Sequence, residues 1–458
     1  MLNRPLLRVA VFAASLVLSP PAVLAQQFVV SGGAVSLSPL FQSEIASFPA
    51  PAFLPYVGAA ANKGQTAFLT NTPATPNGHG SVHLIASESP LARAQIDDYL
   101  KTGLGRIGNG TGHGPLIQIP IAGFPVVISF RGPTGEVSLN KTQLCRVFSG
   151  AYVKWSELGV DAGSAPDRFT VIYHAEDSGI TQILTRHLQA SCGFDSAIAF
   201  EGKSTFAQEF PSDWFPPHFT PAVGSDGAAA AVSASASAIT YMGPDPAFTA
   251  GLGQALLVNP NNNQAYAPSL ESVLTALDGT ASLPVATGVV QRDPDGIAWI
   301  DSNNQANPFN WVRPSPNPTS GYPIVGYASF VFSQCHVDSA VGNAIKDFLN
   351  SHFSARNSAA DWGDMVVRPI MTEKRAQELI AFIQNNPTSP LVNAYKAQLT
   401  AFYDDKANSG EMGQLHLHKL MPLTPAKRMR LLSAFVYGTT ANLDINNTTV
   451  CGNYAGRN

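Results

Sequence analysis

Short apolar runs alternate with segments of helical periodicity along most of the chain. The apolar runs predict strands at residues 28–30, 82–86, 116–121, 125–130, 169–172, 239–242 and 322–332. Apolar positions at helical spacing predict helices from residue 39 through 45 and over 91–100, 139–148, 180–188 and 337–349. Alternating strands and helices indicate an α/β fold, and the continuous apolar strands favour a buried, partly parallel sheet.

Three of the predicted strands lead into a helix start that carries small hydroxyl residues. The candidate capping residues are Ser36 or Ser38 in the first, Ser89 in the second, and Asp177 or Ser178 before Gly179 in the third. Amide groups at an uncovered helix N-terminus, together with the helix dipole, favour an anion. The pattern therefore predicts either one shared anion pocket or three unrelated helix caps, and both interpretations stay open.

The first 25 residues have the pattern of a secretory signal. Arg4 and Arg8 precede an apolar stretch over 9–18, and 23–25 form a cleavage site before Gln26. The apolar stretch is too short to span a bilayer comfortably, and no later segment is a transmembrane candidate. We therefore expect a mature chain without a transmembrane segment, located in the periplasm or secreted.

Composition bears on two questions: whether the protein binds nucleic acid, and which disulfides it can form. The chain has 458 residues, a net charge of −4 and 13% charged residues, which argues against nucleic-acid binding, for which a basic face is expected. The four cysteines form no C-x-x-C pair, so in an oxidising compartment they predict two disulfides with three alternative connectivities. Pairing of neighbours in the sequence, Cys145 with Cys192 and Cys335 with Cys451, is the simplest of the three.

Many short motifs occur in the order found in one known family. They lie at 31–34, 53–58, 63–69, 116–120, 144–150, 224–227, 320–326, 332–335 and 446–451. On these motifs the chain resembles the periplasmic phosphate-binding proteins of ABC transporters (PstS-like), and within them the DING proteins. All four cysteines lie where that family has them, which supports the pairing of sequence neighbours.

The resemblance implies a two-lobed periplasmic binding protein fold of type II, with two hinge strands crossing near 119–122 and 322–326. Lobe 1 would combine residues 26–120 with 326–458, and lobe 2 would comprise 121–325. The implied function is an exported solute-binding protein that holds phosphate or a related oxyanion between the lobes, with no cofactor and no metal. An ABC permease or secretion machinery would be its protein partner.

The family's phosphate ligands map onto this chain with several departures. The ligand set implied by the resemblance is Ser36, Leu37 through its amide, Glu88, His174, Ser178, Gly179 and Ile180. Glu88 stands where the family has Asp, His174 where it has Arg, and Ile180 where it has Thr. Ala61 replaces a serine, and Asn62 or Lys63 is the candidate to compensate. The loss of a permanent cation and two hydroxyls predicts a pocket that is weaker for phosphate or adapted to another anion.

The C-terminal region departs from the family as well. Residues 372–384 and 391–403 predict a helical hairpin inside an insertion at about 365–420, which either packs on lobe 1 or contacts a partner. His416 and His418 are a weak metal candidate, and Ser178 with His174 lacks a G-x-S-x-G motif, so no catalytic residue is predicted. The alternatives to solute binding are a weak secreted phosphatase of the DING type and an extracellular interaction protein.

Overall fold

The computed structural model describes most of the chain between residues 29 and 353 and short parts of the remainder. The described residues are 29–38, 41, 45, 53–72, 81–106, 112–244, 250–278, 308, 312, 316–353, 365–367, 380–385, 387–388, 392, 396, 417–419, 451–452 and 454–457. No helix among them is long and apolar enough to cross a membrane.

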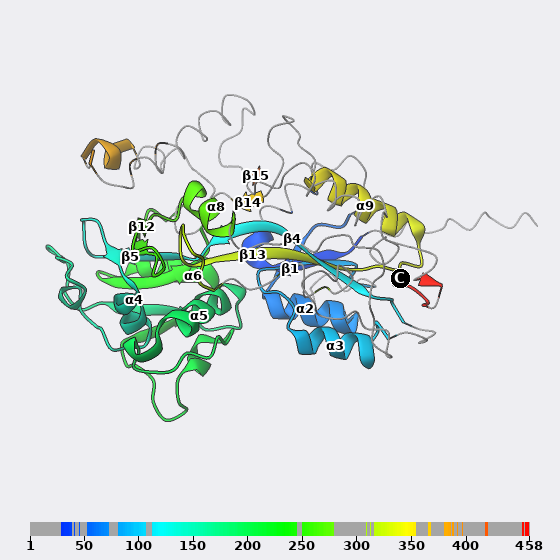
Figure 1. Ribbon diagram of the computed structural model, residues 1–458, viewed down its shortest axis with the longest axis horizontal. Helices are drawn as coiled ribbons and strands as arrows, with labels where there is room; N and C mark the ends of the chain where they lie inside the picture. The colour runs from blue at the N-terminus through cyan, green and yellow to red at the C-terminus, as the bar shows by residue number, and fades with distance from the viewer. Residues whose placement is uncertain are drawn as a thin grey trace, which may run out of the picture.

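A seven-stranded sheet forms the core of lobe 1. Its order is β15 (Leu417–Lys419), β14 (Met365–Val367), β4 (Leu116–Pro125), β13 (Val325–Ser333), β3 (Leu84–Ser87), β1 (Ser31–Ala34) and β2 (Val57–Ala59). Strand β1 pairs in parallel with β2 and β3, whereas β13 is antiparallel to both β3 and β4. Figure 1 shows α2 (Ala61–Thr70) and α3 (Arg93–Lys101) on one face of this sheet and α9 (Ser339–Phe353) on the other.

Lobe 2 contains two smaller sheets. The five-stranded sheet has the order β10 (Gly253–Gln254), β5 (Val127–Arg131), β9 (Ala238–Met242), β7 (Thr170–His174) and β8 (Phe219–Ala222). The three-stranded sheet consists of β12 (Ala265–Tyr266), β11 (Leu256–Val258) and β6 (Ser138–Leu139). The α-helices of this lobe that the structure describes in full are α4 (Lys141–Phe148), α5 (Gly179–Ser191), α6 (Gly224–Ala234) and α8 (Leu270–Asp278).

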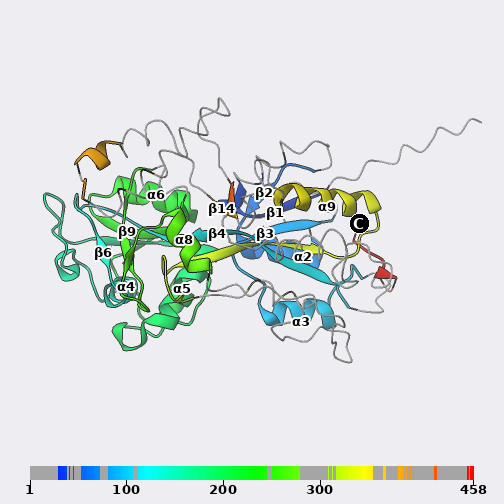
Figure 2. The same cartoon turned by 45° about the horizontal axis from the view of Figure 1, so that its top comes forward.

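The two main sheets share one topology, which confirms the predicted two-lobed fold. In lobe 1 the order β2-β1-β3-β13-β4 places a strand from late in the chain between the third and fourth strands. Lobe 2 repeats this arrangement as β8-β7-β9-β5-β10, where β5 comes from early in the chain. Figures 1 and 2 show β4 and β13 running side by side along the line that joins the two halves.

The chain crosses between the lobes at the ends of the long β4–β13 pair. The amide of Val126 donates to the carbonyl of Ile324 at 2.9 Å, and the hydroxyl of Tyr322 donates to the carbonyl of Val126 at 3.1 Å. The second crossing lies within the predicted 322–326. The predicted first crossing, 119–122, lies inside β4, so the passage into β5 occurs a few residues later.

The glycine-rich segment 31–34 is strand β1, and not the loop that the sequence predicts after a strand at 28–30. A Cβ atom on Gly32 would lie 2.7 Å from the carbonyl oxygen of Val57 on β2, and one on Gly33 would collide with the backbone of Ala86 on β3. The glycines therefore allow both neighbouring strands to approach the backbone of β1 closely. A short 3-10 turn, Val35–Leu37, follows Ala34 directly, so neither Ser36 nor Ser38 caps its start.

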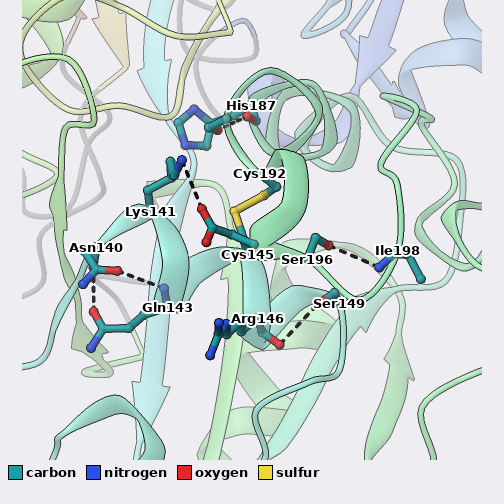
Figure 3. The surroundings of a disulfide bond; sticks show 12 residues. Asn140, Lys141, Gln143, Cys145, Arg146, Ser149, His187, Cys192, Ser196 and Ile198 are labelled. Carbon is teal, nitrogen blue, oxygen red and sulfur yellow. Dashed lines mark hydrogen bonds and ion pairs between the residues drawn. A yellow bond between two sulfur atoms is a disulfide. The ribbon is translucent and has the colours of Figure 1, made fainter.

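Both disulfides join sequence neighbours, as predicted. Cys145 on α4 pairs with Cys192, the C-cap residue of α5, and Figure 3 shows this bond near Lys141. Lys141 forms an ion pair with Asp195. Cys335, which follows β13, pairs with Cys451 near the end of the chain. Their sequence separations of 47 and 116 residues correspond to roughly 4 and 5 kcal/mol of stabilisation in the chain-entropy picture.

The predicted insertion at about 365–420 has a strand near each of its ends, β14 and β15. These two strands pair with each other at the edge of the lobe 1 sheet. Most of the predicted hairpin lies outside the described residues. Its described helical part, 380–385, packs Ile380, Phe382 and Ile383 against the cluster formed by the five-stranded sheet and α6. This packing is on lobe 2, which corrects the expectation of packing on lobe 1.

Candidate functional site

The N-terminus of α5 forms one wall of the site. Strand β7 ends at His174, and the chain reaches α5 through Ala175–Asp177, with Ser178 as the N-cap in extended conformation. The hydroxyl of Ser178 accepts a hydrogen bond from the amide of Thr181, as the predicted capping role requires. The first amides of a helix have no intrahelical acceptor, so this buried helix start offers N–H donors to an anion.

A loop of lobe 1 forms the opposite wall. A Cβ atom built on Gly179 would lie 2.8 Å from Cβ of Glu88, 2.9 Å from its Oε2 and 3.0 Å from Oγ of Ser89. The loop between β3 and α3 therefore lies directly against the first residue of α5, and only glycine leaves room there. Asn62, in the first turn of α2, donates from Nδ2 to Oδ2 of Asp177 and adds a second contact between the lobes.

Several buried polar atoms around this contact have no hydrogen-bond partner in the part of the chain that the structure describes. Oγ of Ser89, Nε2 of His174 and Oδ1 of Asp177 are buried and accept or donate no hydrogen bond among the described residues. Ser89 and His174 are 3% and 1% exposed, so water on the open surface does not satisfy them. Since buried polar groups normally have a partner, a polar ligand between the lobes would complete this set.

Glu88 contributes a carboxyl that prefers to stay protonated. Burial, with a second contribution from the nearby charge of Glu176, raises the pKa of Glu88 to about 8. Burial also raises the pKa of Tyr56 well above its usual value, with a second contribution from Glu88. A protonated carboxyl can donate a hydrogen bond to an oxyanion, whereas an ionised carboxylate can only accept.

His174 and Glu176 form a pair on the lobe 2 side. Nδ1 of His174 lies 3.3 Å from Oγ of Ser178 and 3.3 Å from Oε1 of Glu176, while the ring stacks on Tyr241. Burial raises the pKa of Glu176, but the bonds from His174 and from the amide of Gly224 outweigh this effect, so the pKa is lowered overall. Glu176 is therefore an ionised carboxylate that is already paired with protein groups.

The structure brings together four of the predicted ligand residues: Glu88, His174, Ser178 and Gly179. Ile180 and the side chain of Leu37 lie in the apolar core, each 2% exposed, so only their backbone groups could serve a ligand. The side chain of Ser36 is outside the described residues.

Two contacts of the site escape the sequence prediction. Ser89 does not cap α3, because that helix begins at Arg93, with Ala92 as N-cap and Gln95 Oε1 accepting from the Ala92 amide. Ser89 instead faces Gly179. The pairing of Asn62 with Asp177 joins residues 115 positions apart, and only the suggestion that Asn62 compensates for Ala61 pointed toward it.

The comparisons with known proteins agree with this two-lobed binding site. Residues 26–356 match the PBP superfamily domain, and the chain belongs to this superfamily. It is 30% identical to alkaline phosphatase L of Pseudomonas aeruginosa over 94% of both chains. It is also 29% identical to a phosphate-binding protein of an unknown prokaryotic organism, over 80% of this chain and 92% of that protein.

Solved structures extend the likeness to nearly the whole chain. The crystal structure of a phosphate-binding protein from Stenotrophomonas maltophilia superposes with a TM-score of 0.68 at 27% identity, covering 94% of this chain and 99% of that one. A high-affinity periplasmic phosphate-binding protein of the DING group, solved with bound phosphate, superposes with a TM-score of 0.66 at 25% identity, covering 94% and 100%.

Proposed function

We propose that this protein is an exported solute-binding protein that holds phosphate or a related tetrahedral oxyanion between its lobes, at the N-terminus of α5. The observation that carries this proposal is the buried contact of Gly179, the residue after the N-cap Ser178, with Glu88 and Ser89 across the lobe boundary. It combines helix amides, hydroxyl groups and unpartnered buried polar atoms at one place. Relatives named or solved as phosphate-binding proteins support the same ligand.

The donor set suggests how the anion would be held. The amides at the start of α5 and the hydroxyls of Ser178 and Ser89 would donate to its oxygens. Protonated Glu88 would donate as well, and Nε2 of His174 is the remaining candidate donor. Because no guanidinium of the described residues takes part, we expect affinity lower by roughly 1.5–3 kcal/mol than in a site with a charged bidentate partner.

We further propose that the mature protein acts in the periplasm or outside the cell. The signal pattern over residues 1–25, the two disulfides and the periplasmic relative solved with phosphate support this location. An ABC permease is the partner that a periplasmic solute-binding protein would serve, and a secretion machine is the alternative for a protein that leaves the cell.

A weak phosphatase activity is the second candidate, because a relative that aligns over 94% of this chain is named alkaline phosphatase L. The geometry favours binding over hydrolysis. A serine–histidine–carboxylate relay uses one ring nitrogen for the serine and the other for the carboxylate. Here Nδ1 of His174 faces both Ser178 and Glu176, and Nε2 has no partner among the described residues.

A pair of cap variants tests the proposed binding site. Ser178→Ala removes a hydroxyl from the site together with a helix cap, whereas Asn140→Ala removes the equivalent cap of α4 away from it. We expect each to cost about 1 kcal/mol of folding stability. Only Ser178→Ala should also weaken phosphate binding, by about 10-fold for one lost hydrogen bond. Titration calorimetry with phosphate, sulfate and arsenate measures the affinities.

Two outcomes would contradict the proposal. One is a wild-type protein that binds none of the three anions; the other is a Ser178→Ala variant that binds them as tightly as Asn140→Ala does. Turnover of an aryl phosphate by the same preparations, lost in Ser178→Ala and kept in Asn140→Ala, would favour the phosphatase instead.

A further inference from the structure

One face of α5 continues from the anion site into a pocket between the lobes. Gly179, Ile183 and Arg186 are spaced i, i+4 and i+7, so they lie on the same face of the helix. Gly179 lies against Glu88, and a Cβ atom on Gly326 of β13 would collide with the end of Ile183. This face of α5 is therefore directed toward the β3–α3 loop and the crossing strand.

The pocket extends along this face and reaches Glu88. Ile183 and Arg186 line it from α5, Gly326 and Tyr327 line it from β13, and Glu88 lines it from the β3–α3 loop. Leucine, valine and proline side chains form the rest of its wall. Glu88 lines the pocket and also contacts Gly179 at the start of α5, so the pocket adjoins the proposed anion site.

Arg186 places a positive charge in this largely apolar pocket, with no ion-pair partner among the described residues. No hydrogen bond or ion pair joins its guanidinium to any residue that the structure describes, and its stem packs near Gly202. Burial lowers the pKa of Arg186, yet an arginine side chain stays protonated in proteins. The adjacent His187 is not a partner of Arg186, because its ring is hydrogen-bonded to the carbonyl of Pro316. A partly buried cation without a partner is costly, and an anion would offset that cost.

We infer that this pocket receives the second anionic group of an organic phosphate or phosphonate, with the phosphoryl group at the start of α5 and the second anion on Arg186. The inference rests on the proposed function and names the ligand class of the same site. The seven residue steps from Gly179 to Arg186 rise about 10 Å along the helix. The arginine side chain shortens that span, since side chains on a helix lean toward its N-terminus. A phosphorylated small carboxylic acid fits this length.

The experiment compares two probes that differ in one anionic group. 3-Phosphoglycerate carries a phosphate and a carboxylate, whereas glycerol 3-phosphate has a hydroxyl in place of the carboxylate. Titration calorimetry on the full mature protein should show 3-phosphoglycerate binding about 10-fold more tightly. In Arg186→Gln the ratio of the two affinities should fall to about one, and Arg186→Lys should retain part of it.

Arg93→Gln is the matched control, because Arg93 pairs with Asp97 on the surface of α3; the ratio should stay as in the wild type. Equal affinities of the wild-type protein for the two probes would overturn the inference, as would a preference that survives in Arg186→Gln. The wild-type comparison decides even if a variant fails to fold. Binding of inorganic phosphate without discrimination between the probes would leave the proposed function intact, whereas binding of none of the three would overturn both.

Discussion

Glu88 and Glu176 lie near one helix start, yet their surroundings give them opposite ionisation. Glu88 is 5% exposed, and burial raises its pKa to about 8. Glu176 is also partly buried, but His174 and the Gly224 amide hold its pKa below the usual value. One carboxyl can therefore donate a hydrogen bond, while the other accepts from the protein itself.

The raised pKa of Glu88 predicts a stability that falls with pH. A carboxyl whose pKa rises from 4.5 in the unfolded chain to about 8 in the fold favours folding most when it is protonated. Raising the pH from 4.5 to 8 should therefore cost roughly 5 kcal/mol, and Glu88→Gln should remove this pH dependence. Chemical unfolding of the ligand-free protein between pH 5 and 9 measures the slope.

Glu271→Gln serves as the control for that slope, since Glu271 is exposed in the first turn of α8. It should leave the pH dependence of the wild type unchanged. A Glu88→Gln variant that loses stability between pH 5 and 8 as steeply as the wild-type protein would show that Glu88 is ionised in the fold.

At the scale of elements, Arg457 near the C-terminus connects several elements of lobe 1 through hydrogen bonds. Arg457 is fully buried and donates to Oγ of Ser333, Oδ1 of Asn71 and the carbonyls of Val82 and Phe68. It thereby joins the chain end, which the Cys335–Cys451 disulfide also holds, to α2, to the entry of β3 and to β13. A single side chain thus completes hydrogen bonds of three elements.

Arg457→Leu should destabilise the protein by roughly 3–5 kcal/mol, because it leaves buried acceptors without a donor. Arg93→Leu, which breaks only a surface pair with Asp97, should cost at most about 1 kcal/mol. Urea unfolding compares the two free energies. Equal losses in both variants would mean that the buried bonds of Arg457 contribute no more than an exposed ion pair.

Elements with a strong local sequence pattern were predictable from the sequence. Elements that depend on contacts with strands distant in the sequence were not. Strand β7 and helix α5 follow the predicted run at 169–172 and the helical spacing from Ile180. Strand β1 has no apolar alternation, because its glycines serve the close approach of β2 and β3. The site divides in the same way: Ser178 shows a local capping pattern, whereas the contact of Glu88 with Gly179 depends on the closed fold and was reached through the family resemblance.

For the whole molecule, the contact of Gly179 with Glu88 and Ser89 sets how closely the two lobes can approach. These residues belong to different lobes, and the chain segments that cross between the lobes are hydrogen-bonded to each other at Val126 and Ile324. A ligand held by both walls favours the closed arrangement by its extra contacts there, and at 100 times its Kd it stabilises the bound state by about 2.7 kcal/mol.

Gly179→Ala should therefore hold the lobes apart. Its Cβ atom would lie 2.8 Å from Cβ of Glu88, which is not the movable end of that side chain. We expect phosphate affinity to fall at least about 10-fold, as for a loss of about 1.4 kcal/mol, and phosphate to produce no decrease in the radius of gyration by small-angle X-ray scattering. Gly227→Ala is the control, because the nearest atoms to its Cβ, on Ala222 beside α6, would be 3.9 Å away. That variant should bind and compact like the wild-type protein, and the same behaviour in Gly179→Ala would show that closure does not depend on this contact.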